Sequence, residues 1–148
     1  MKIYPLLLVL MLGVLPGMTA NAGDRGTPDE AKAMAIKAAD YLRQTGPEAA
    51  FAAFNAKDGP WHDRDLYVFV TDAANKVHAH GGNVGLVGRD MTTLRDVDGE
   101  PIFVRIGAVK DAGWVEYKWQ DPVTKAIEPK TTYVVREGEY TVGVGAYK

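Results

Sequence analysis

Cysteine and serine are both absent from the 148-residue chain. Without cysteine, the protein has no disulfides, no thiolate-ligated metal cluster, no haem attached through Cys-x-x-Cys-His and no lipoprotein-type lipidation. Without either residue there is no cysteine nucleophile and no Gly-x-Ser-x-Gly elbow, which removes the usual covalent hydrolases from consideration. An exported domain without disulfides fits a bacterial periplasm better than a eukaryotic secretory route.

Clusters of positive charge and long apolar segments are also missing from residues 23–148. The net charge is −2, with 17 basic and 19 acidic residues scattered along the chain, and this distribution gives no support to nucleic-acid binding. No apolar run in this part approaches the roughly 20 residues that a membrane helix needs. There are no repeats, and the length suits one domain with a single core.

The first residues have the pattern of a signal peptide. MKIYP carries one positive charge, LLLVLMLGVL is apolar, and Ala20-Asn21-Ala22 is a small-x-small cleavage site. We therefore expect a signal peptide over residues 1–22, cleavage after Ala22, and a single mature domain over residues 23–148. The expected location is the periplasm or the extracellular medium.

The mature chain begins with two predicted helices. Thr27 and Glu30 have the spacing of a capping box, and Pro28 suits the first helical position. Apolar residues then recur at helical spacing, which predicts a helix to about Gln44 that ends at Gly46. A shorter helix follows from residue 47 and ends before residue 58.

The second half predicts five strands, because β-branched and aromatic runs alternate there with turn residues. The predicted strands cover 66–71, 77–80, 113–122, 127–136 and 140–147. A helical turn is expected over 89–94 and a short helix over 101–109. A long helix packed on a five-stranded antiparallel sheet is an α+β architecture. The long connection between the second and third strands could fold over one sheet face and enclose a cavity.

Several blocks of the sequence resemble a known family. In order they are DLYVFVTDAANKVHAH, LVGRDM, DVDGEPIF, GWVEYKWQDPVTKAIEPKTTYV and VGVGAY. Together they resemble the single Cache domain, a PAS-like extracellular sensor module, from the first helix to Tyr147. The resemblance implies a periplasmic sensor of the kind found in chemoreceptors and histidine kinases. It further implies a pocket between sheet and crossover that binds a small organic molecule, often a short carboxylate.

The chain differs from a complete receptor because the sequence contains no transmembrane helix after residue 22 and no cytoplasmic output domain. It is therefore similar to a stand-alone, soluble member of the family. We expect it to capture a ligand and to present it to a membrane receptor or kinase, and we expect no cofactor. Two alternatives remain: a structural or interaction domain without a small ligand, and an enzyme that uses a His80–Asp pair.

Aromatic residues on two predicted strands are candidates for the pocket wall. Strand alternation places Val115, Tyr117 and Trp119 on one face and Trp114, Glu116 and Lys118 on the other. We favour the first face because its rings combine apolar walls with polar tips, and ordinary core packing is the alternative. Tyr67 and Phe69 either complete these walls or pack against a helix.

Four polar residues are candidates for ligand contacts. The resemblance implies that Lys130 and Tyr133 form an anion clamp, although residues three apart on a strand face opposite sides unless a bulge intervenes. His80 could donate a hydrogen bond to the ligand or be satisfied by a main-chain carbonyl. Arg89 could reach the pocket or pair with a nearby aspartate.

Two further patterns carry predictions about metals and close contacts. His78 and His80 are predicted to share a strand face, but the third histidine has no diagnostic spacing, so we expect no metal site. Gly143 and Gly145 alternate with apolar residues in the last strand. Their missing side chains predict close approach of the long helix or of a second subunit, as in a homodimer.

Overall fold

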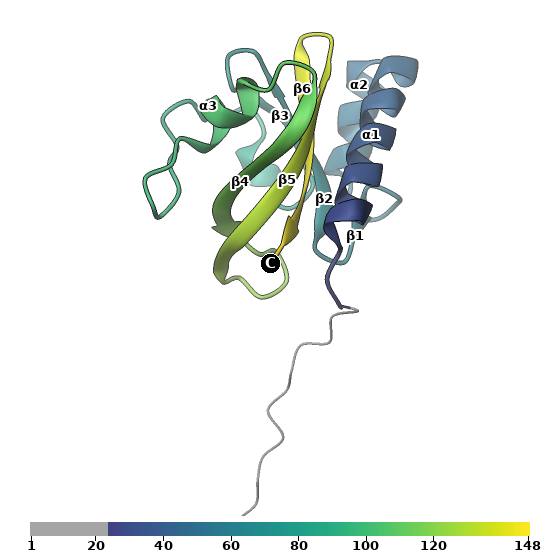
Figure 1. Ribbon diagram of the computed structural model, residues 1–148. Helices are drawn as coiled ribbons and strands as arrows, with labels where there is room; N and C mark the ends of the chain where they lie inside the picture. The colour runs from purple at the N-terminus through teal and green to yellow at the C-terminus, as the bar shows by residue number, and fades with distance from the viewer. Residues whose placement is uncertain (1–23) are drawn as a thin grey trace, which may run out of the picture.

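The computed structural model describes residues 24–148, so the predicted signal peptide lies outside the described residues. Helices α1 (Pro28–Thr45) and α2 (Pro47–Asn55) lie together on one side of a twisted antiparallel sheet. The crossover that contains α3 (Ile102–Gly107) lies away from them, near β4 (Figure 1). Within residues 24–148, no helix has the length and apolar character needed to cross a membrane.

The sheet formed by residues 24–148 has six strands, five of them predicted from sequence. They are β1 (His62–Asp63), β2 (Leu66–Asp72), β3 (Val77–His80), β4 (Ala112–Gln120), β5 (Ile127–Glu137) and β6 (Tyr140–Tyr147). The order is β1-β2-β6-β5-β4, and β3 also pairs with β2. All these pairings are antiparallel, which confirms the predicted α+β architecture; only the two-residue β1 was not predicted.

The start and end of α1 follow the sequence prediction. The Thr27 hydroxyl accepts a hydrogen bond from the Glu30 N–H, and the Glu30 carboxylate accepts one from the Thr27 N–H at 2.7 Å. Gly46 ends the helix with a positive φ of 84°, and its N–H donates to the Leu42 carbonyl. Such a φ favours glycine, which is why the helix stops here.

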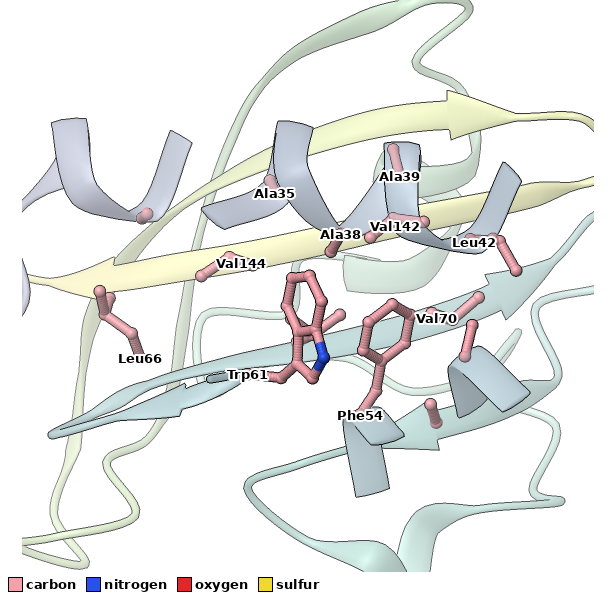
Figure 2. Close-up of a cluster of buried hydrophobic side chains, with 14 of the residues drawn as sticks. Ala35, Ala38, Ala39, Leu42, Phe54, Trp61, Leu66, Val70, Val142 and Val144 are labelled. Atoms are coloured by element: carbon pink, nitrogen blue, oxygen red, sulfur yellow. The ribbon is translucent and has the colours of Figure 1, made fainter. Parts of the chain in front are cut away.

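The helical layer packs through small residues. Ala35 and Ala38 of α1 are fully buried and lie against the sheet beside Val142 and Val144 of β6 (Figure 2). Alanine at these positions allows the helix to approach the strands closely, and Phe54 and Trp61 fill the space beside them. This core fixes one sheet face, which leaves the opposite face to the crossover.

The crossover forms a second core on the opposite face. Phe103 and Ile106 of α3 pack with Phe69, Val115 and Val134 of the sheet. The helical turn predicted over 89–94 is found only in part: residue 90 forms a β-bridge, and a single turn follows in which the Leu94 N–H donates to the Met91 carbonyl. A 3-10 helix lies earlier, at Val84–Leu86. The side-chain oxygen of Asn83 accepts a hydrogen bond from the Gly85 N–H. This bond caps the start of the 3-10 helix and so fixes it upstream of the predicted position.

A β-bulge in the β2–β3 pair corrects the prediction for the two histidines. The register shifts between Val70 and Thr71, so His80 pairs with Phe69 while His78 has no direct partner on β2. The extra residue places His78 on the helical side, where its Nε2 lies 2.8 Å from Asp72. His78 and His80 therefore do not share a face, because a bulge interrupts the two-residue alternation.

Side chains from the neighbouring strands lie over the two glycines of β6. A Cβ at Gly143 would lie 2.3 Å from the Phe69 ring, and one at Gly145 would lie 2.3 Å from both the Lys130 Cε and the Thr132 Oγ1. The prediction that α1 approaches these glycines is wrong, because α1 packs on the other face of β6. The glycines instead allow two long side chains to lie across the strand.

Candidate functional site

The candidate site is centred on Lys130, a β5 residue that is only 1% exposed. Its ammonium donates a hydrogen bond of 2.8 Å to the Tyr67 hydroxyl. It also lies 4.2 Å from the centroid of the Tyr67 ring and 4.9 Å from that of Tyr147. None of the ion pairs among residues 24–148 includes this lysine. The site thus contains a buried cation that contacts phenols rather than a carboxylate.

The electrostatic environment of Lys130 favours an anion. Burial lowers the pKa of Lys130 to about 7, while the negative charges of Asp65 and Asp121 oppose this shift. A desolvated ammonium is stabilised only partly by aromatic rings and one hydroxyl. A carboxylate next to Nζ would restore the charged form through a charge-assisted hydrogen bond.

His80 lies beside this cation and is buried. Burial lowers the pKa of His80 to about 3, and the positive charge of Lys130 adds to the shift. The ring is therefore neutral at pH 7, and its Nδ1 accepts a 2.9 Å hydrogen bond from the Asn83 N–H. A neutral imidazole that accepts at Nδ1 carries its proton on Nε2, so His80 presents a hydrogen-bond donor.

Three phenols surround the same region. The hydroxyls of Tyr117 and Thr132 lie 2.9 Å apart, and the Tyr147 hydroxyl donates to the Gln120 carbonyl at 2.7 Å. Burial is the main cause that raises the pKa values of Tyr67, Tyr117 and Tyr147. All three therefore remain protonated at neutral pH and offer polar tips on apolar walls.

An aromatic wall closes the side toward the crossover. The Phe103 ring lies 6.1 Å from both Phe69 and Trp119, centroid to centroid, and Trp119 lies 6.2 Å from His80. Trp119 also lines an open surface cavity of about 340 Å³ together with Ile102 and Ile127. The indole thus lies between this cavity and His80, while Tyr117 and Lys130 line a second open surface cavity of about 220 Å³.

The structure brings together six of the eight predicted site residues on the crossover face of the sheet. They are Tyr67, Phe69, His80, Tyr117, Trp119 and Lys130. Tyr133 lies on the helical side, because β5 has no bulge to bring it to the face of Lys130; its ring contacts Trp114 at 5.0 Å. Arg89 is exposed on the loop after the 3-10 helix.

A sequence profile of one family, Single Cache domain 2, matches residues 17–148. The chain belongs to the single Cache domain 2 family. The methyl-accepting chemotaxis protein McpP of Pseudomonas putida is 31% identical to this Cache domain over 91 residues. That match covers 58% of this chain and 17% of the relative, so the chain spans less than a fifth of the curated protein.

Solved structures of sensor domains share this Cache fold. A methyl-accepting chemotaxis protein from Vibrio parahaemolyticus superposes with a TM-score of 0.69 at 20% identity, over 80% of this chain and 86% of that chain. A Cache chemosensory domain described for its carboxylic acid recognition gives 0.63 at 24% identity, over 80% and 86%. A periplasmic sensor domain of a chemotaxis protein gives 0.61 at 25% identity, over 80% and 88%.

Sequence reasoning missed several residues that this Cache domain places around Lys130. Tyr147 pairs with Lys130 across the β5–β6 hairpin, whereas the predicted strand ends at residues 136 and 140 would have paired Lys130 with Ala146, one residue away. Thr132 could have been found from alternation, because it lies two residues after Lys130 on the same strand. Phe103 and the charged neighbours Asp65 and Asp121 come from distant segments, and no local pattern points to them. Within residues 24–148, no group of three histidine or acidic side chains is placed to hold a metal ion.

Proposed function

We propose that this Cache domain is a periplasmic sensor module that captures a short monocarboxylate at Lys130. The observation that carries the proposal is the burial of this cation without an ion-pair partner among residues 24–148. Support comes from two relatives: the Pseudomonas putida chemotaxis protein and the Cache domain described for carboxylic acid recognition. Occupancy would then be signalled through a membrane receptor or kinase.

The donors around Lys130 support a carboxylate as the occupant. Nζ of Lys130 and Nε2 of His80 are donors on the same side of the sheet, and the Tyr67 hydroxyl, which accepts from Nζ, keeps its own proton to donate. Anionic acceptors form stronger hydrogen bonds with such groups than neutral ones do. In the free protein the rings of Tyr67 and Tyr147 stabilise the ammonium. A bound carboxylate would take over part of this role as an ion-pair partner.

The opposite wall supports a single carboxylate rather than two. Phe69, Phe103 and Trp119 form that wall, and Val115 lies beside them. A second carboxylate placed against these rings would be desolvated without a partner, which is strongly unfavourable. One cation and one apolar wall therefore favour acetate or propionate over succinate as the ligand.

The surroundings of His80 favour binding over catalysis. Its Nδ1 accepts from a main-chain N–H, and the histidine that contacts an aspartate is His78, on the other face. A general base needs an accessible proton-accepting nitrogen within reach of the substrate. His80 lacks that geometry, so we assign it a hydrogen-bonding role.

A thermal-unfolding screen tests the proposal. Acetate or propionate at about a hundred times Kd should raise the Tm of the wild type by roughly 5–15 °C, because ligand binds only the folded state. Succinate should raise it much less. Lys130→Met should abolish the shift, whereas the exposed Lys57→Met should keep it. If Lys130→Met is still folded and gains the same shift as the wild type, the lysine is not the anion site.

A further inference from the structure

The segment before α1 is fixed to three parts of the domain by polar contacts. The Arg25 guanidinium donates to the main-chain oxygen of Lys148 at 3.0 Å through Nη1. Its Nη2 pairs with the Glu128 carboxylate and lies 3.4 Å from Asp121 Oδ2. Arg25 therefore joins the entry of α1 to the end of β6 and to the β4–β5 turn.

The next residue strengthens the same connection. The Gly26 N–H donates to Asp65 Oδ1 at 2.7 Å, and the Arg25 carbonyl accepts from Arg64 at 2.8 Å. A Cβ at Gly26 would lie 2.2 Å from the Leu66 side chain, so the segment is pressed against β2. We call Arg25 and Gly26, with these contacts, the N-terminal clasp.

Two of the three acidic partners of the clasp are buried carboxylates whose negative charges act on Lys130. Asp65 and Asp121 are each 1% exposed, and both act on the charge of Lys130. Within residues 24–148, Asp65 Oδ2 has no hydrogen-bond partner. Tyr147 gives a direct connection, because its ring lies 4.9 Å from the Lys130 ammonium while its hydroxyl binds the Gln120 carbonyl, next to Asp121.

We infer that Arg25 is a positioning residue for the anion site, so that anion binding at Lys130 and closure of the N-terminal clasp reinforce each other. This rests on the proposed function for the identity of the anion. Arg25 pairs with Asp121, whose negative charge also acts on Lys130, and an anion added next to protonated Lys130 makes this cluster more negative. The attraction of the cluster for Arg25 then increases. By linkage, a closed clasp raises anion affinity by the same factor.

The first test needs no ligand. It compares Tm values of the full chain carrying Arg25→Gln, Lys130→Met, both changes or neither. Because both cations offset the negative charge of buried Asp121, Arg25→Gln should lower the Tm more in the Lys130→Met background than in the wild type. Arg43→Gln, which removes an exposed arginine of α1 paired with Asp40, should lower it equally in both. If the Tm of the double variant falls by the sum of the losses in Arg25→Gln and Lys130→Met, the inference is overturned.

The second test uses propionate as the probe. Arg25→Gln should weaken propionate binding about 5-fold, Arg25→Lys should restore part of it, and Arg43→Gln should leave it unchanged. Propionate should also slow amide hydrogen exchange at residues 26–30 in the wild type. Unchanged affinity in Arg25→Gln together with unchanged exchange would overturn the inference. If the wild type binds none of the tested carboxylates, the proposed function fails, and the ligand-free comparison alone decides whether Arg25 and Lys130 are coupled.

Discussion

Lys130 is buried where two phenolic rings meet, and its side chain crosses the space left by Gly145. Cation–π contacts of this kind contribute about 0.5–2 kcal/mol each, which is less than the cost of removing an ammonium from water. The part of the desolvation cost that these contacts do not offset is the physical reason why an anion should bind here. It also places the titration of Lys130 close to neutral pH.

The affinity for propionate should fall as the pH rises above about 7. Burial lowers the pKa of Lys130 to about 7 in the free protein, and the anion binds its protonated form. Above that pH each unit should reduce affinity by up to tenfold, and binding should be accompanied by proton uptake. Calorimetry in buffers of different ionisation enthalpy, from pH 6 to pH 9, measures both quantities. A constant affinity over this range would contradict the assignment.

The unfolding free energy of the ligand-free protein should also depend on Lys130. The folded-state pKa of about 7 lies below the ordinary 10.5, so between these values the unfolded chain binds the additional proton. Stability contributed by this group therefore rises with pH across that window and is lowest below pH 7. Urea unfolding of the wild type and Lys130→Met at pH 6, 8 and 9.5 measures the difference. The two proteins should differ in slope, with the steeper rise in the wild type.

At the scale of the strand, alternation decides which predicted residues can act together. In β4 the alternation is regular, and Val115, Tyr117 and Trp119 share the crossover face as predicted. In β5 the same regularity separates Lys130 from Tyr133. In β3 a bulge places His78 and His80 on opposite faces of the sheet, and no residue type in VHAH predicts that bulge.

Gly145→Ala should disturb the site more than Gly113→Ala. A Cβ at Gly145 would lie 2.3 Å from the Lys130 Cε, whereas one at Gly113 would meet only Val109 at 3.6 Å, an ordinary contact. Both are strand residues without positive φ. Overpacking at Gly145 should cost about 1–3 kcal/mol of unfolding free energy and should weaken propionate binding.

Urea unfolding and a propionate titration of both glycine variants measure these effects. Gly113→Ala should stay close to the wild type in both experiments. Equal effects of the two substitutions would show that Lys130 does not need the space above β6.

At the scale of the molecule, the two ends of the described chain meet. Arg25 precedes α1 and contacts Lys148, which follows β6; Figure 1 shows the chain end beside the entry to α1. Lys130 pairs with Tyr147, the last residue of β6. A change at the anion site is therefore separated from both ends of the domain by only a few contacts.

Export should release a protein that starts at Gly23. The prediction rests on the apolar run and the Ala20-Asn21-Ala22 site, and it makes Arg25 the third residue of the mature chain. Intact-mass measurement of protein recovered from the periplasm of a bacterial host checks the cleavage position. Recovery of a chain that still begins at Met1 would contradict it, and Ala22→Asp should block processing.

The sequence by itself determined the two helices, five of the six strands and the face of β4 that carries its rings, because each depends on residues close together in the chain. The tertiary structure alone decided that Lys130 contacts Tyr67, 63 positions away, and that the negative charges of Asp65 and Asp121 act on the same cation. The pairing of β6 with both β2 and β5 brings Tyr67 and Lys130 together. Periodicity within a segment specifies which way a side chain faces, and only the packing of distant segments specifies what it meets.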